Sequence, residues 1–130
     1  MFEFFPPLPQ NKANSLSPVT LAFVGDAVYS LYIRQKFVLS ADYPPAELQK
    51  LTSAEVSAHG QNALLHRIEG QFTEEEAAIF KRGRNAKKPS HSKNADLAEY
   101  NNSTGLEAVI GWLYLTGQSE RLLQLLEEKQ

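Results

Sequence analysis

The 130-residue sequence contains no cysteine and only three histidines. Disulfide bonds and thiolate metal sites are therefore excluded, and the sequence argues against a zinc site. The three histidines, His59, His66 and His91, lack the spacing of a ligand set, so we expect them to serve in the core or on the surface. Carboxylate oxygen atoms are the metal ligands that this composition favours.

The sequence also lacks a long uninterrupted apolar run and a leader segment. Its most apolar stretch, residues 16–33, is interrupted by Pro18, Gly25 and Asp26, which fits a core helix better than a membrane span. The first ten residues contain no basic segment and no small-residue cleavage site, so no signal peptide is expected. Because no transit peptide is recognisable either, we expect a protein of the bacterial cytoplasm that does not bind membranes.

Strand patterns are missing too. No run alternates between apolar and polar residues, and there is no internal repeat and no glycine-rich phosphate loop. The hydrophobic content of 42% and charged content of 22% are those of an ordinary globular protein. We therefore expect one all-α domain over residues 15–130, long enough to form a core. Residues 1–14, which are rich in proline, are expected to be an irregular arm pinned by its aromatic side chains.

Start and stop signals predict a series of helices in this domain. They span residues 18–38, 46–68, 73–82, 95–100, 103–117 and 120–128. Ser17 is the expected N-cap of the first helix, and Thr73 with Glu76 fits a capping box at the third. A break in the second helix, if present, falls near Thr52, and residues 84–94 are expected to be a loop.

Two of these helices are nearly all apolar and carry one charge each. The first has Asp26 within residues 16–33, and the second has Glu107 within residues 103–117. The first stretch is apolar around most of its circumference, which predicts that it is buried. A lone carboxylate in such a helix needs a partner, a metal ion or water. We therefore predict that the two helices pack together and share a divalent cation, for which carboxylates and Mg²⁺ are well matched.

Two glycines lie near these acids. Gly25 precedes Asp26, and Gly111 follows Glu107 by one turn, so the helices are expected to approach closely there. Packing alone explains the glycines. For the acids, the alternative interpretation is that each is a hydrogen-bonded or partly exposed structural group.

A basic segment, residues 81–93, is the other notable feature. It holds six of the 13 lysines and arginines, whereas all 15 acids lie outside it. Such a run is often a solvated face, but this one also contains glycine, proline, serine and asparagine, as a loop does. These residue types contact phosphates, so we expect a nucleic-acid backbone as partner.

These stretches resemble a known family. LAFVGDAVY resembles the signature helix of the ribonuclease III family, and TGLEAVIGWLYL resembles its second acidic helix. FTEEEAAIFKRGRNAK, followed by NSTGLEAVIGWLYL, is similar to Mini-ribonuclease III, the short members that lack a double-stranded-RNA-binding domain. The resemblance implies a ribonuclease III-like helical bundle that forms a homodimer, with the first helix in the interface. It also implies hydrolysis of double-stranded RNA with Mg²⁺, or Mn²⁺ in its place, leaving 5′-phosphate ends. The implied substrate is the stem of precursor 23S ribosomal RNA, with a ribosomal protein or ribosomal particle as a further partner.

The family's functional residues carry over position by position. Asp26 and Glu107 match its catalytic and metal-binding acids. Two further acids of longer members fall on Ala22 and Thr104, a departure typical of the Mini type, and Thr104 is expected to orient a metal-bound water. The residues expected to bind RNA are Lys81, Arg82, Arg84, Asn85, Lys87, Lys88 and Lys93.

Two other functions remain open from the sequence. Ala22 and Thr104 in place of acids keep open a non-catalytic RNA-binding module of the same fold, associated with the ribosome. A helical protein-interaction domain that binds an acidic partner through the basic segment is the third hypothesis.

Overall fold

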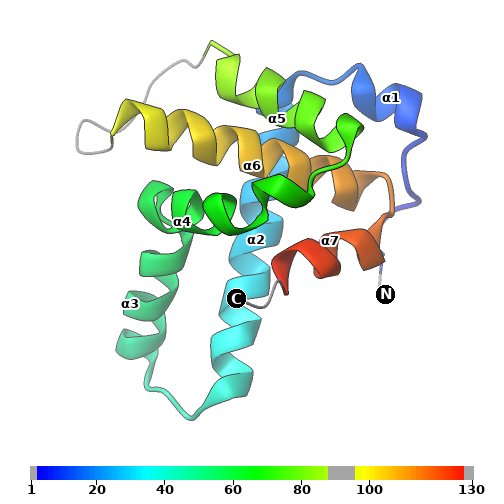
Figure 1. Ribbon diagram of the computed structural model, residues 1–130. Helices are drawn as coiled ribbons and strands as arrows, with labels where there is room; N and C mark the ends of the chain where they lie inside the picture. Colours follow the sequence, from blue (N-terminus) through cyan, green and yellow to red (C-terminus); the bar gives the residue numbers. More distant parts are fainter. Residues whose placement is uncertain (1–2, 88–95, 128–130) are drawn as a thin grey trace.

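The computed structural model describes residues 3–87 and 96–127, which form helices and no β-strand (Figure 1). The elements are α1 (Gln10–Asn14), α2 (Pro18–Ser40), α3 (Pro45–Val56), α4 (Ala58–Ile68), the 3₁₀-helix η1 (Glu69–Gln71), α5 (Glu74–Asn85), α6 (Leu97–Leu115) and α7 (Ser119–Leu126). The predicted all-α class is confirmed. None of the described helices has the length and apolar character needed to cross a membrane.

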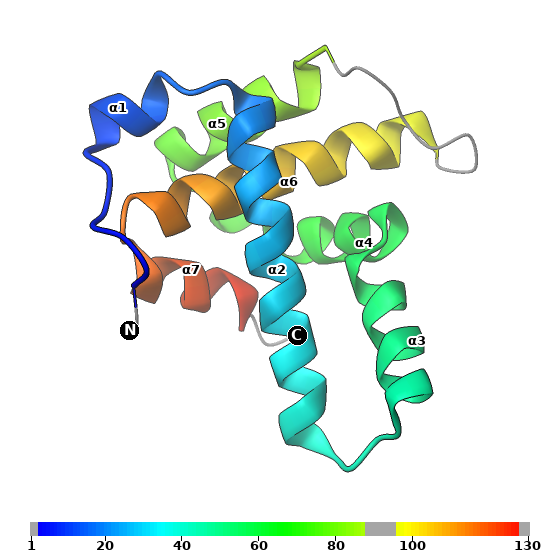
Figure 2. The same cartoon turned by 180° about the vertical axis from the view of Figure 1, so that it is seen from behind.

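Helix α6 is the centre of the bundle. It packs against α2, α4, α5 and α7, with α5 on one side and α4 on the other in both views (Figures 1 and 2). It supplies six of the 19 buried apolar residues in the described part of the chain, among them Trp112, which is 2% exposed. The indole Nε1 of Trp112 donates to Oδ1 of Asn14 at 2.7 Å, which ties α1 to the end of α6.

The long helix α2 crosses α6. Ser17 caps it as predicted, accepting from the backbone N–H of Val19. The prediction that this helix is buried all round is wrong, because only one side faces α6. On the other side Phe23 is 80% exposed and Leu31 61% exposed, because none of the residues that the structure describes covers this second apolar face.

Glycines set the distance between α2 and α6. A Cβ placed on Gly25 would collide with the backbone carbonyl of Glu107, and a Cβ on Gly111 would collide with that of Leu21. The backbone of each helix therefore occupies the space that a side chain at the glycine of the other helix would need. The predicted close approach is confirmed, and it places the residue after Gly25 beside Glu107.

Several element boundaries differ from the sequence-based prediction. The break between α3 and α4 falls at Ser57, whose hydroxyl caps α4 by accepting from the N–H of Gly60. Helix α5 continues through Gly83 to Asn85, because that glycine packs against α6 rather than ending the helix. The two helices expected over residues 95–117 are one, α6, capped by Asp96.

The capping box at the start of α5 is confirmed and has a further partner. Glu76, which is 2% exposed, accepts from the N–H of Thr73, whose hydroxyl accepts from the N–H of Glu76. Arg121 of α7 donates to both oxygens of the same carboxylate, at 2.8 and 2.9 Å. Burial alone would raise the pKa of Glu76, but Arg121 and the Thr73 N–H hold it below its ordinary value.

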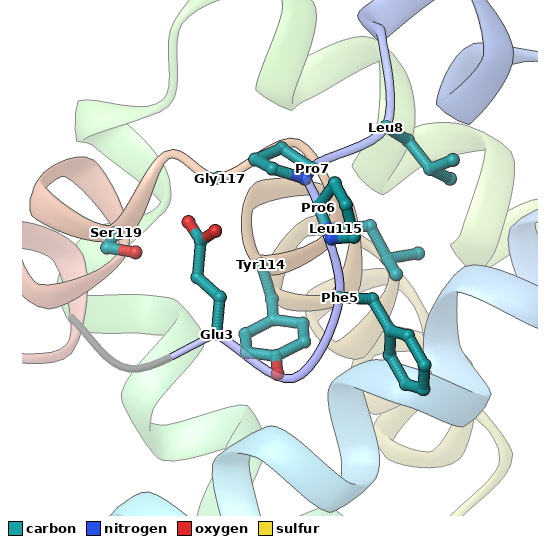
Figure 3. A pocket seen from close by; sticks show the side chains of 9 residues that line it. All are labelled: Glu3, Phe5, Pro6, Pro7, Leu8, Tyr114, Leu115, Gly117 and Ser119. Carbon is teal, nitrogen blue, oxygen red and sulfur yellow. The ribbon is translucent and has the colours of Figure 1, made fainter.

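The N-terminal arm lies over the end of α6. The N–H of Leu8 donates to the carbonyl of Leu115 at 2.8 Å, and Pro7 lies against Gly117 (Figure 3). Phe4 and Phe5 are largely exposed, and part of the arm forms α1 instead of irregular chain. A cavity of about 240 Å³ between the arm and α6 has one acid in its wall, Glu3, and so offers little for binding a cation.

Candidate metal centre

Asp26 and Glu107 line one cavity of about 510 Å³. Asp26 comes from α2 and Glu107 from α6, and the glycine contact between these helices brings the two residues together. The wall is completed by the junction of α3 and α4, by Gln61 of α4, and by the first turns of α6. Two acids that are far apart in the sequence therefore face the same space.

The Glu107 carboxyl group is strongly perturbed by this environment. Burial raises its pKa most, a hydrogen bond from Gln61 lowers it, and hydrogen bonding with Asp26 and the charge of Asp26 raise it, giving a pKa of about 8. Burial therefore favours the protonated form of Glu107 when no cation is present. Asp26 is exposed to solvent, so the cavity is open on its side.

Gln61 is a site residue that the sequence analysis missed. Its Nε2 donates to Oε2 of Glu107 and to the carbonyl of Val56, both at 3.0 Å. The residue is 2% exposed, and its Oε1 is buried without a hydrogen-bond partner. A signal was available, because Gln61 precedes the buried Leu64, Leu65 and Ile68 at helical spacing and so occupies a core position.

The donor set of this cavity fits Mg²⁺. Two carboxylates face one space, and a buried amide oxygen in its wall lacks a partner. Magnesium is held in proteins by one or two carboxylates together with water and substrate phosphate. No cluster of three or more histidine, cysteine or acidic side chains with metal-binding geometry occurs in the described residues, so the carboxylate pair is the candidate.

His59 and Glu99 form the rim of the same cavity. Nδ1 of His59 lies 2.8 Å from Oε2 of Glu99, and the imidazole is largely exposed. This position agrees with the expectation of a surface histidine, but no sequence pattern indicates that it borders the acidic pair. The contact joins the start of α4 to the start of α6.

Thr104 and Ala22 are both buried near the crossing of the helices. The hydroxyl of Thr104 donates to the carbonyl of Tyr100 at 3.2 Å, and Thr104 is not among the residues that line the cavity. The neighbouring Ser103 does line the cavity, and its hydroxyl also donates to the carbonyl of Tyr100. That Thr104 orients a metal-bound water stays a prediction. The hydrogen bond to Tyr100 does not favour this role.

The basic residues lie apart from the cavity. Lys81, Arg82, Arg84 and Asn85 belong to the last turns of α5 and not to a loop, because α5 extends to Asn85. The guanidinium of Arg82 donates to the backbone carbonyls of Asn14 and Leu16, at 3.4 and 3.3 Å, so this side chain has a structural contact. Lys87 is exposed just beyond the helix.

The other residues predicted to bind RNA, Lys88 and Lys93, lie outside the described residues. Helices α5 and α4 lie on different sides of α6 (Figure 2). The described basic residues and the acidic cavity are therefore on different flanks of α6 in the single chain.

Comparisons with known proteins agree with these features. The family described as Ribonuclease III domain matches residues 19–118. The chain is similar to Mini-ribonuclease 3 of Thermoanaerobacter sp. (strain X514), with 47% identity over 113 residues that make up 87% of this chain and 80% of the relative. It is also similar to Mini-ribonuclease 3 of Staphylococcus aureus, with 43% identity over 120 residues, 91% of this chain and 90% of the relative.

The fold has a counterpart among solved structures. A crystal structure of a Fusobacterium nucleatum protein superposes with a TM-score of 0.79 and 34% sequence identity, covering 87% of this chain and 90% of that chain. The family match includes both acid-bearing helices and most of the chain. The chain therefore belongs to the ribonuclease III family, in its Mini-ribonuclease III branch.

Proposed function

We propose that this chain is a Mg²⁺-dependent endoribonuclease that cleaves double-stranded RNA and leaves 5′-phosphate ends. The observation that carries the proposal is the meeting of Asp26 and Glu107 in one cavity at the crossing of two helices. Membership of a ribonuclease family supports RNA as the substrate. Mn²⁺, which has the same charge and also accepts oxygen ligands, is expected to substitute for Mg²⁺.

Asp26 and Glu107 would hold the cation in this proposal. When bound, the cation supplies Lewis-acid polarisation of a phosphate and a water molecule of lowered pKa. The acids contribute their charge and position: Glu107 is fixed by Gln61, and Asp26 faces solvent, from which an RNA strand can approach. Because Glu107 has a raised pKa, it must lose its proton before it binds the cation.

RNA binding is assigned to the exposed basic residues at the end of α5 and beyond it. Lys81 and Lys87 are exposed and have the charge to contact the phosphate backbone. Contacts of this kind read the shape of an A-form duplex rather than its sequence. Arg82 is expected to contribute less, because its guanidinium already binds two backbone carbonyls.

A homodimer is part of the proposal. Three large apolar side chains that helical spacing places on the uncovered side of α2 are at least 59% exposed: Phe23, Leu31 and Val38. An apolar face of this kind marks an interface, and a two-fold dimer through α2 would present one cavity to each strand of an RNA duplex. Maturation of precursor 23S ribosomal RNA in the bacterial cytoplasm, on a ribosomal particle, is the biological role that we propose.

The function is tested by incubating the protein with a long RNA duplex in Mg²⁺ and, separately, in EDTA. We expect fragments with 5′-phosphate ends in Mg²⁺ only. Asp26→Asn and Glu107→Gln should abolish cleavage, because each removes a charged oxygen ligand, while the folded structure is kept. Asp42→Asn and Glu120→Gln are matched controls at exposed positions away from the cavity, and they should cut at the wild-type rate.

Two results would contradict the proposal. Equal cleavage by wild type, Asp26→Asn and Glu107→Gln would remove these acids from the reaction. Duplex RNA that is retarded in a gel but stays intact in Mg²⁺ and in Mn²⁺ would instead favour the second candidate, a non-catalytic RNA-binding module. One observation supports that candidate. Ala22 and Thr104 stand where longer family members have two further acids.

A further inference from the structure

Gln61 has a feature that the proposed reaction leaves unexplained. Its side chain is almost fully buried, and both described hydrogen bonds use the nitrogen, one to Val56 and one to Glu107. Its amide oxygen, which is also buried, has no partner. Buried polar atoms in native proteins are nearly always satisfied, so this oxygen calls for a ligand that the protein chain itself does not supply.

The orientation of the amide is set by its neighbours. Both atoms that face the nitrogen are acceptors, the Val56 carbonyl and Oε2 of Glu107, so exchanging the nitrogen and the oxygen would bring acceptors together. The oxygen is therefore the end that is left without a partner. Gln61 lines the cavity that contains Asp26 and Glu107, and its nitrogen bonds Glu107, so this cavity is the space from which a ligand can reach the side chain.

Among the described residues, Gln61 has the buried side-chain oxygen that makes no hydrogen bond at all. Thr104 and Ser103 both direct their hydroxyl hydrogens to the carbonyl of Tyr100. Glu99 lies on the rim, where it is bound to His59. A hydrated Mg²⁺ ion held by two carboxylates needs acceptors for the hydrogens of its water molecules, and Gln61 has a buried acceptor that is free.

We propose that Gln61 is a positioning residue of the cation site with two roles. Its N–H group holds Glu107 in place, and its free Oε1 accepts a hydrogen bond from a water molecule carried by the cation. Groups that hydrogen-bond to the ligands of a metal hold those ligands in position. Loss of such a group typically weakens metal binding by about 10–100-fold. This inference rests on the proposed function, because it takes the cavity to be a cation site.

A purely structural role makes a different prediction. If Gln61 serves only to tie Glu107 to the Val56 carbonyl, then every variant without the N–H donor should fail alike. If the amide oxygen also serves the cation, a variant that keeps an oxygen acceptor should bind metal better than one that has none. Gln61→Met and Gln61→Glu separate these roles, because both lose the donor and only the second keeps acceptor oxygens.

The experiment measures Mn²⁺ binding to the full chain from the electron paramagnetic resonance signal of free Mn²⁺ at fixed pH. We expect Gln61→Met to raise the Kd for Mn²⁺ by about 10–100-fold. Gln61→Glu should bind Mn²⁺ within about threefold of wild type, because its carboxylate keeps an oxygen that can accept from a water molecule of the cation. Asn62→Ala is the control, since Asn62 is the next amide on α4, binds Asn102 and does not line the cavity.

Folding of each variant is checked by thermal unfolding in EDTA. If Gln61→Met does not fold, the comparison of Gln61→Glu with wild type decides, and a Kd more than about tenfold above that of wild type overturns the proposal. Unchanged Mn²⁺ affinity in Gln61→Met also overturns it, and so does equal loss of affinity in both variants.

The failure of the proposed function has a different signature. In that case wild type neither binds Mn²⁺ nor cleaves duplex RNA, and the inference about Gln61 falls with it. If wild type binds Mn²⁺ and cleaves RNA while Gln61→Met does both equally well, only the inference about Gln61 is wrong. The Mg²⁺ concentration that gives half-maximal cleavage provides a second readout, and we expect Gln61→Met to raise it.

Discussion

Glu107 is the residue whose charge depends most on its surroundings. Burial and the nearby Asp26 raise its pKa to about 8, against an ordinary value of 4.5. Between these two pH values the folded chain binds a proton at Glu107 that the unfolded chain does not bind. The unfolded state is therefore increasingly favoured as pH rises through this window, and the metal-free protein should lose stability from about pH 4.5 to pH 8.

Glu107→Gln tests this directly in the metal-free protein. A glutamine carries no charge, so its amide oxygen can still accept from Gln61 without the cost of ionisation. We expect the variant to raise the free energy of unfolding at pH 8 by on the order of 1–3 kcal/mol, and to change it little at pH 5. Chemical denaturation in EDTA at both pH values measures the difference. A variant that is less stable than wild type at pH 8 would contradict the raised pKa.

Single residues differ in how well the sequence predicts them. Asp26 and Glu107 were found because each is the only charge in an otherwise apolar helix, and burying a lone charge is costly. Gln61 was missed because an uncharged amide in a mostly polar helix does not stand out by composition. The pairing of His59 with Glu99 joins residues 40 positions apart, and no local pattern encodes such a contact.

Among the elements, the pair α2 and α6 has the tightest geometry. The space that a Cβ at Gly111 would need is occupied by the backbone of Leu21. This backbone cannot move without displacing α2. Gly111→Ala should therefore lower the free energy of unfolding by about 3 kcal/mol or more, and should separate Asp26 from Glu107 and reduce metal binding.

Gly70 provides the matched control. A Cβ placed there meets no atom within 4 Å, and its backbone is not in the left-handed region. Gly70→Ala should be neutral or stabilise the protein by about 0.4–1 kcal/mol, because alanine restricts the unfolded chain. Thermal or chemical denaturation of both variants checks the pair. Equal effects of the two substitutions would contradict the close packing at Gly111.

Helix starts were predicted more accurately than helix continuity. Ser17 and Thr73 act as caps because their side chains satisfy backbone N–H groups locally, and local chemistry is readable from sequence. The helix α6 was predicted as two pieces because several residues near its first turns are good caps. Tertiary packing decides which cap is used: Ser103 is buried in the middle of α6 and bonds back to Tyr100.

At the scale of the whole molecule, the uncovered face of α2 is the main feature. Apolar composition predicted that this helix is buried, and the described residues of one chain leave Phe23 and Leu31 exposed. The sequence pattern does not distinguish a surface covered by the same chain from one covered by a second copy. The resemblance to the family supplied the expectation of a homodimer, and the exposed Phe23 and Leu31 are its physical support.

Light scattering on the purified protein tests the dimer. We expect a mass of two 14.5 kDa chains for wild type. Phe23→Glu should give the mass of one chain, because a charge would be buried in the apolar contact. Phe5→Glu is the control: Phe5 is as exposed as Phe23 but lies on the N-terminal arm, and this variant should stay dimeric. A monomeric wild type would contradict the assembly.

The central claim is that Asp26 and Glu107 together hold one divalent cation. Crystals soaked in Mn²⁺ test it most directly, because the anomalous scattering of manganese locates the ion without reference to activity. We predict an anomalous peak in the cavity in contact with oxygen atoms of both carboxylates. A fully soaked crystal with no peak between Asp26 and Glu107, or with manganese bound only elsewhere on the protein, would contradict the account.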